Sequence, residues 1–321
     1  MTETPERPVA VVTGASRGLG FLLARTLGRR GYDLVVCARS EKGLAAARPN
    51  LAETGAEVLA IPADVSKREQ AESLIAGAVA RFGRIDMLVN NAGVIQVGPA
   101  VTMSHEQFAE ALDVTLWGTV HTTLAAIPTM RDQEHGRIVT ISSVGGKLPA
   151  PHLLPYTTAK YAVTGFSEGL RVELAKYGIS VTTVVPGLMR TGSPRNALFT
   201  GDRVGEYRWF AVADSLPLLS MDAEVAAERI VRAAVRGRAE VVLGPVAKLG
   251  VLAHGVAPGL VADMVGLVDR LLPRAEPGGS PVPGHTVTRR MSKAVHVVTG
   301  LTRIAAIRFH QHDDRTPTPP E

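Results

Sequence analysis

Tyr156 and Lys160, in the stretch YTTAK, are four residues apart in a segment with helical periodicity. Residues at this spacing share one face of a helix, so the phenol and the ammonium are neighbours. A phenol has an unperturbed pKa of about 10, poorly matched to neutral pH, and a nearby cation favours its ionised form. The pair therefore indicates a general acid and base rather than ordinary packing.

A glycine-rich stretch, TGASRGLG, lies between the first apolar run and the first helical segment. Glycines at 14, 18 and 20 allow a tight turn and the close approach of a pyrophosphate, whose charge sits at the helix N-terminus. This position predicts a dinucleotide site rather than a plain turn, with Ser16 and Leu19 completing the loop. The cofactor-binding residues expected here are Gly14, Ser16, Arg17, Gly18, Leu19 and Gly20.

The second apolar run ends in CARS, where an NAD site usually offers an acid to the ribose 2′-hydroxyl. Arg39 stands there instead, and Arg17 in the glycine loop can reach the same place. Either arginine alone is more often a solvated surface residue. Two guanidinium groups suit a 2′-phosphate, so together they predict NADP(H) rather than NAD as the cofactor.

Seven short apolar runs alternate with amphipathic segments along the chain: VAVVT, DLVVC, AEVLAIP, DMLVN, GRIVTIS, ISVTTVVP and AEVVLG. Buried parallel strands are continuously apolar, so this order predicts an α/β fold with a doubly wound (Rossmann) sheet of about seven parallel strands. The pattern ends near Gly244. We expect a Rossmann-fold dinucleotide-binding and catalytic domain over 1–245, a helical C-terminal extension over 246–312 and a disordered tail over 313–321.

The bulk composition fits a cytoplasmic enzyme. Charged residues make up 20% of the 321 residues, Cys37 is the single cysteine, and no apolar run reaches the ~18 residues of a spanning helix. The net charge of +5 is modest, and its surplus beyond residue 285 fits a solvated helix face better than a nucleic-acid partner. The nine histidines lack ligand spacing, so no metal is expected.

Further motifs follow in order: DV at 64–65, NNAG at 90–93, Ser143, and PGLMRT at 186–191. With the glycine loop and YTTAK, they make residues 8 to about 245 resemble a short-chain dehydrogenase/reductase. The resemblance implies hydride transfer between NADP(H) and a carbonyl/alcohol pair, with Tyr156 as the acid/base and Ser143 orienting the substrate oxygen. Lys160 would also bind the nicotinamide ribose.

The resemblance also assigns the rest of the cofactor site. It implies that Asp64 and Val65 meet the adenine and that the NNAG residues line the ribose side. It implies that the PGLMRT residues hold the nicotinamide. The residues so assigned are Asp64, Val65, Asn91, Ala92, Gly93, Pro186, Gly187, Leu188 and Thr191.

One position departs from the family pattern. Thr115, in DVTLWG, stands where the family commonly has an asparagine that completes a tetrad with Ser143, Tyr156 and Lys160. A threonine can still distort a helix by bonding the carbonyl of the preceding turn. We therefore expect an active enzyme with Thr115 in the proton relay.

Other candidates are weaker. GFSEG at 165–169 matches a serine-hydrolase elbow, but it lies inside a continuous helical pattern and fits helix packing better. His152 could touch substrate, although a loop histidine facing water is the more common case. Trp117 and Phe166 are expected in the core or at a subunit contact of a homodimer or homotetramer.

Two classes of function remain open. The first is an NADP(H)-dependent oxidoreductase acting on a bulky apolar carbonyl/alcohol substrate, because the stretches 144–155 and 192–221 mix apolar and aromatic residues with few acids. The second is a nucleotide-binding regulator or scaffold of the same fold that has lost turnover. Intact Ser143, Tyr156 and Lys160 favour the enzyme.

The extension 246–312 can bury its apolar faces against the subunit, covering the substrate entrance or a neighbouring chain, or it can bury them in a membrane interface. Pro258 interrupts the pattern, and Asp263 and Asp269 would be repelled by anionic lipid. These residues favour packing on the protein over peripheral membrane contact.

Overall fold

The computed structural model describes residues 7–216, 219–274, 279–288 and 299–311. Its centre is a seven-stranded parallel sheet with the order β11-β7-β6-β4-β1-β2-β3. The strands are β1 (Val9–Thr13), β2 (Asp33–Ala38), β3 (Val58–Pro62), β4 (Met87–Asn90), β6 (Gly136–Ile141), β7 (Ile179–Pro186) and β11 (Glu240–Leu243). Each coincides with one of the seven apolar runs, so the predicted fold class is confirmed.

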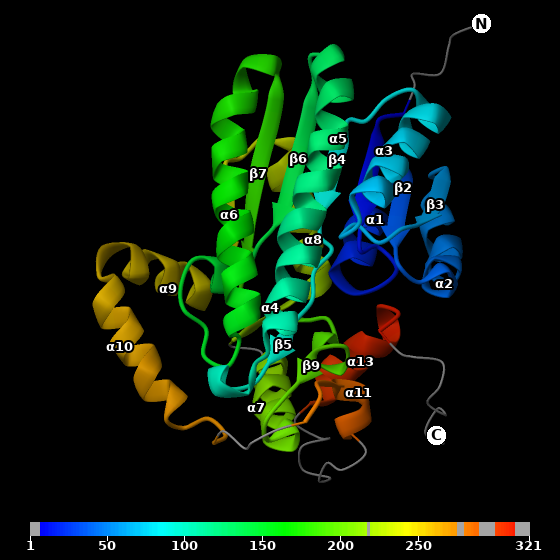
Figure 1. Cartoon of the computed structure of the whole chain (residues 1–321). Coiled ribbons are helices and arrows are strands. Elements are labelled where there is room, and N and C mark those ends of the chain that lie inside the picture. Colours follow the sequence, from blue (N-terminus) through cyan, green and yellow to red (C-terminus); the bar gives the residue numbers. More distant parts are fainter. Residues whose placement is uncertain (1–6, 217–218, 275–278, 289–298, 312–321) are drawn as a thin grey trace, which may run out of the picture.

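Helices cover both faces of the sheet (Figure 1). Alternate residues of β1 serve the two sides: Ala10 and Val12 join one core cluster, and Val9 and Val11 join the other. The first cluster packs against α1 (Gly18–Arg29), α2 (Glu41–Ala52) and α8 (Ala223–Val235). The second packs against α3 (Arg68–Phe82), α5 (Gly118–Asp132) and α6 (Leu154–Leu174).

The strand order reverses between β1 and β4. In an open parallel sheet the loops that follow two such strands diverge and leave a crevice at their carboxyl ends. A short helix, α4 (His105–Leu112), joins α5 through the π-helical turn Asp113–Trp117. The motif GFSEG lies within the unbroken helix α6, as its sequence context indicated.

Small elements build a wall beside the carboxyl edge of the sheet. They are a three-stranded sheet, a two-stranded sheet and helix α7 (Arg203–Ser215). The strands are β5 (Gln96–Val97), β9 (Leu198–Phe199) and β12 (Val282–Pro283) in the first, and β8 (Leu188–Arg190) and β10 (Ser220–Asp222) in the second. Single 3-10 turns are Ala100–Thr102, Val144–Gly146, Ala175–Tyr177 and Ser193–Arg195.

The C-terminal extension has two parts that behave differently. Its second part, α11 (Gly284–Val287) and α13 (Gly300–Arg308), packs on the subunit with Val287, Ala305 and Phe309 buried. Its first part, which we call the arm (residues 245–274), contains α9 (Pro245–Val256) and α10 (Pro258–Asp269) and stands out from the body (Figure 1).

The arm meets the body where it lines a cavity, and the expectation that it covers the substrate entrance or a neighbouring chain stays a prediction. Only Ala247 is buried among the arm's residues, all of which the structure describes. The chain turns at Ala257, before Pro258, and α10 runs past the body rather than lying flat on it. The expected tail at 313–321 lies outside the described residues. Within the described part of the chain, no helix is both long enough and apolar enough to cross a bilayer.

Candidate active site

The ends of β1 and β4 are held together by Thr13 and Asn91. The Thr13 hydroxyl accepts hydrogen bonds from the backbone N–H groups of Asn91 (3.0 Å) and Ala92 (3.1 Å). The Asn91 side-chain amide donates to the Thr13 carbonyl at 3.0 Å. These bonds fix the glycine loop against the NNAG loop, so Asn91 acts here through the backbone it positions.

The glycine loop needs its glycines. Gly14 has φ +64°, a conformation that L side chains rarely adopt. A Cβ on Gly20 would lie 2.2 Å from the Gly14 carbonyl oxygen, so only glycine lets α1 start this close to the end of β1. The N-terminus of α1 borders the cavity, and the N–H of Gly18 there is bonded to the Phe309 carbonyl at 2.8 Å.

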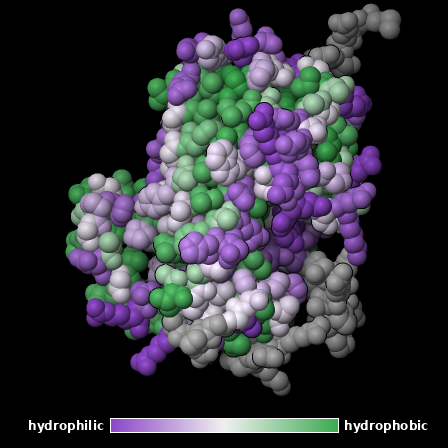
Figure 2. All heavy atoms as spheres, viewed as in Figure 1, coloured by the Kyte–Doolittle hydropathy of each residue, from purple (hydrophilic) through white to green (hydrophobic). Residues whose placement is uncertain are grey.

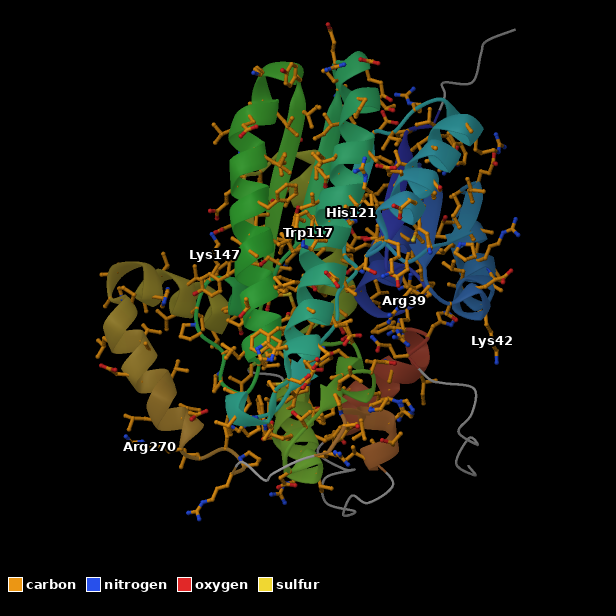
Figure 3. All side chains as sticks on the ribbon, in the orientation of Figure 1. Arg39, Lys42, Trp117, His121, Lys147 and Arg270 are labelled. Carbon is orange, nitrogen blue, oxygen red and sulfur yellow. The ribbon has the colours of Figure 1, made fainter. Side chains whose placement is uncertain are left out.

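Three cations lie at the far end of the same crevice. Arg39 follows β2, Arg17 belongs to the glycine loop, and Lys42 is in the first turn of α2, whose N-terminus is capped by Ser40 (Figure 3). All three cations are exposed and line one cavity. Sequence reasoning missed Lys42, although the segment ARSEK places it three residues after Arg39. These three side chains give this end of the cavity a positive charge that can bind an anionic group.

Ser143, Tyr156 and Lys160 come together at the end of β6. The Ser143 hydroxyl accepts a hydrogen bond from the Gly145 N–H at 3.2 Å and lies close enough to the Tyr156 phenol to lower its pKa by hydrogen bonding. The neighbouring Ser142 hydroxyl is held instead by Thr164 on α6, at 2.6 Å. Lys160 is buried, and its ammonium donates to the Ile141 carbonyl at 2.7 Å while lying 5.7 Å from the centre of the Tyr156 ring.

The pKa of Tyr156 moves in the direction opposite to the one the sequence suggested. Burial raises it, the hydrogen bond from Ser143 lowers it, and the nearby Asp214 raises it. Burial lowers the pKa of Lys160 to about 8. Burial also raises the pKa of Asp214 to about 8. In the protein alone, desolvation is the largest cause of the shift in the pKa of Tyr156, and the phenol stays protonated at neutral pH.

Thr115 lies beside this group, in the π-helical turn. A Cβ on Gly93 would be 3.4 Å from the Thr115 hydroxyl oxygen and 3.6 Å from the Lys160 nitrogen, so the two groups face the same point. The expected bond from this hydroxyl to the preceding turn is not formed. The hydroxyl is buried without a hydrogen-bond partner among the described residues. The helix is bent by its π turn, and the Thr115 carbonyl accepts the Thr119 hydroxyl at 2.8 Å.

The segment after β7 closes the other end of the crevice. Its backbone leaves the sheet at Gly187 and pairs with β10 through β8. Thr191 is buried, and its hydroxyl accepts the Ser193 N–H at 3.2 Å.

One cavity of about 1330 Å³ is lined by every site residue predicted from the sequence except Thr115. Beyond Tyr156 the cavity wall is largely apolar, with Leu148 from the loop after β6, Phe210 from α7 and Val265 from α10. The sequence pointed to the first two segments as the pocket wall and to the extension as a possible cover of the substrate entrance.

His152 has a different role from either one expected. Its side chain is 7% exposed and so does not face water, and it does not line the cavity. Its Nδ1 lies 2.7 Å from Glu206 of α7, and its Nε2 lies 3.4 Å from Asp269 of α10. Glu206 also accepts the Trp209 indole N–H at 2.6 Å. The histidine thus joins α7 to the arm.

The C-terminal segment also reaches the cofactor crevice, which sequence reasoning missed. The Phe309 carbonyl accepts the N–H of Gly18 at 2.8 Å. The Gln311 side chain accepts the Asn196 amide at 2.6 Å, and His310 packs edge-on against Phe21 with ring centres 4.7 Å apart. His310 and Gln311 line the cavity together with the glycine loop. Their separation of some 290 residues from that loop leaves no local signal.

Comparisons with known proteins agree with this geometry. The family model for short chain dehydrogenase matches residues 8–198. The 11-beta-hydroxysteroid dehydrogenase A of Sesamum indicum is 36% identical over 233 residues, covering 71% of this chain and 66% of its own length.

Among solved structures, a short-chain dehydrogenase from Streptomyces avermitilis has a TM-score of 0.72 at 30% identity and covers 83% of this chain and 98% of its own. A short chain dehydrogenase from Mycobacterium paratuberculosis bound to NAD has a TM-score of 0.66 at 25% identity, covering 74% and 96%. The matched segment contains the glycine loop, Ser143, Tyr156 and Lys160, and it spans more than half of the chain. The chain therefore belongs to the short-chain dehydrogenase family of oxidoreductases.

Proposed function

We propose that the protein is an NADP(H)-dependent oxidoreductase that interconverts a carbonyl and an alcohol on a bulky apolar substrate, with Tyr156 as the acid/base. The observation that carries this proposal is that Ser143, Tyr156 and Lys160 line one cavity, which has a cationic cofactor end and an apolar substrate end. The family uses nicotinamide cofactors, which supply or accept the hydride.

The side chains account for the proton and the substrate oxygen. In the reducing direction, Tyr156 donates its phenol proton to the carbonyl oxygen as that oxygen gains negative charge. Ser143 donates a hydrogen bond to the same oxygen and holds it next to the phenol. Lys160 then stabilises the phenolate that is left, because an ammonium in a buried site favours a neighbouring anion.

The proposed preference for NADP(H) over NAD(H) rests on three cationic side chains. Arg17, Arg39 and Lys42 give the adenosine end a charge that matches a 2′-phosphate. One relative binds NAD, so family membership alone does not decide between the cofactors, and the proposed preference rests on these side chains.

A homodimer or homotetramer is proposed from an apolar face on α5 and α6, visible in the upper part of Figure 2. Its exposed residues include Trp117, Leu124, Tyr161 and Val172. Apolar patches of this kind on a single subunit mark contact surfaces.

The proposal is tested with a panel of apolar ketones, aldehydes and secondary alcohols, followed by the absorbance of the reduced cofactor. Each substrate is measured with NADP(H) and with NAD(H), and Tyr156→Phe serves as the inactive control. Turnover that prefers NADP(H) and requires Tyr156 is the expected result. Cofactor binding without turnover of any panel member would instead favour the regulator or scaffold.

A further inference from the structure

The arm, residues 245–274, presents apolar side chains to solvent on most of its surface. Its two helices have twelve residues each. Seven large apolar side chains are between 59% and 87% exposed: Leu249, Leu252, Val256, Leu260, Met264, Leu267 and Leu271. Figure 2 shows apolar atoms along the outer edge of this part of the molecule.

A helix that is apolar on all sides is normally buried in a protein core or in a membrane. The described part of the chain does not bury the arm, so another apolar phase has to cover it. Twelve helical residues are about 18 Å long, shorter than the ~30 Å hydrocarbon core of a bilayer. The arm therefore fits a helix pair that lies in the membrane interface and does not span it.

The arm also forms part of the substrate cavity. Val246, Val265, Val268 and Leu272 line the cavity, and Val246 and Val268 are themselves about half exposed. The apolar cavity and the apolar outer surface are thus two sides of a layer one helix thick. An apolar molecule dissolved in a bilayer would meet the cavity wall without crossing water.

A second copy of the chain is a less suitable occupant. The face on α5 and α6, with Trp117 and Val172 exposed, already offers a flat apolar surface for self-association. The arm lies beyond the loop after β6 and projects away from the body (Figure 1).

The charges of the arm match an anionic lipid surface. Lys248, Arg270 and Arg274 are exposed, and Arg270 points away from the body in Figure 3. Of the two acids, Asp269 faces His152 at 3.4 Å, which leaves Asp263 as the acid directed only to solvent in this segment. With three basic and two acidic side chains, the arm carries a net charge of +1, so basic residues prevail.

We infer that the arm docks the protein on an anionic membrane surface and that the substrate enters the cavity from the lipid. The second half of this inference rests on the proposed function, whereas the docking itself does not. Membrane binding is therefore measured first, without any substrate.

The experiment is co-sedimentation of the full-length protein with vesicles of phosphatidylcholine alone or with phosphatidylserine, at low and high salt. We expect binding that increases with phosphatidylserine and weakens with salt. Leu252→Glu should reduce the partition coefficient by about tenfold or more, because a buried leucine is exchanged for a charge. Val101→Glu is the matched control, since Val101 is 83% exposed outside the arm. Neither residue lines the cavity.

Three outcomes would overturn the inference. One is that the protein ignores vesicles at both salt concentrations. Another is that Leu252→Glu and Val101→Glu reduce binding equally. The third is a solution mass that falls when Leu252→Glu is introduced, which would show that a second copy covers the arm. If vesicles bind but the panel gives no turnover, docking stands and the proposed function fails.

Once docking is established, the route of entry is tested with a long-chain ketone held in vesicles and a short water-soluble ketone. Leu252→Glu should raise KM for the vesicle-held ketone by about tenfold. It should leave kcat and KM for the soluble ketone unchanged. Equal effects on both ketones would contradict entry from the lipid.

Discussion

Arg39→Asp should convert the cofactor preference from NADPH to NADH. Arg39 is exposed, so its interaction with a phosphate is screened by water, and a charge pair at about 4 Å contributes about 1 to 4 kcal/mol. The substitution removes a cation and adds an anion against a 2′-phosphate that carries a charge of about −1.5 to −2. Arg17 and Lys42 remain and offset part of the loss.

We therefore expect kcat/KM for NADPH to fall by a factor of about 30 to 1000, which corresponds to about 2 to 4 kcal/mol. The kcat/KM for NADH should stay within about threefold of that of the parent protein, because the new carboxylate can accept a hydrogen bond from the 2′-hydroxyl. The assay is the initial rate with each cofactor at saturating substrate. Raising the salt concentration should narrow the gap between the two cofactors in the parent protein.

Arg48→Asp is the matched control. Arg48 is also exposed and lies on α2, but it does not line the cavity. The same charge change there should alter NADPH and NADH kinetics by less than about threefold. An equal loss for both cofactors in Arg39→Asp would refute the reasoning, as would an Arg48→Asp variant that matches it. The first result would show that Arg39 has a structural role. The second would show that the effect comes from the net charge of the protein.

Four further predictions follow from the reacting group and the extension. Tyr156→Phe should lower kcat by about 100-fold or more at unchanged cofactor affinity by titration, because the phenol proton is lost and the ring is kept; turnover within tenfold of the parent would exclude Tyr156 as the acid/base. The rate of carbonyl reduction should decline above about pH 8, because burial lowers the pKa of Lys160 to about 8 and the ammonium loses its proton there. Asp214→Asn removes the second group whose pKa is about 8, so it should isolate the titration of Lys160. A rate that stays constant up to pH 10 in the parent protein would contradict this prediction. Thr115→Asn should leave kcat near that of the parent, because the π turn bends the helix without the threonine hydroxyl; a large gain would mean that the natural relay is impaired. Truncation after Gly244 should lower the midpoint of thermal unfolding and cause aggregation, because it exposes the side chains that pack against Phe309 and Ala305. Removing only residues 312–321 should have neither effect. Equal thermal midpoints for the two truncations would show that α13 contributes nothing to stability.

Local sequence determined the framework of this protein. Each of the seven strands is a continuous apolar run, because a parallel strand is buried on both faces and the pattern needs no long-range information. The glycine loop is likewise local, since Gly14 and Gly20 are required by the turn in which they lie. Together with Ser143, Tyr156 and Lys160, which line the same cavity, these residues were enough to predict a cofactor site and a reacting group at one edge of the sheet.

Tertiary structure decided the features that depend on burial and on distant partners. The raised pKa of Tyr156 follows from desolvation and from Asp214, which the sequence does not connect with the tyrosine. His152 is enclosed by Glu206 and Asp269, which come from two other elements. Phe309 meets Gly18 across nearly the whole chain.

The arm shows most clearly which features follow from local sequence and which depend on tertiary structure. Its apolar helices could be read from the sequence, because their composition is local. Whether they lie on the body or away from it depends on the turn at Ala257 and on the surfaces available nearby. Helix formation is set by short-range hydrogen bonds and propensity, whereas docking is set by the shape of a surface that exists only after folding.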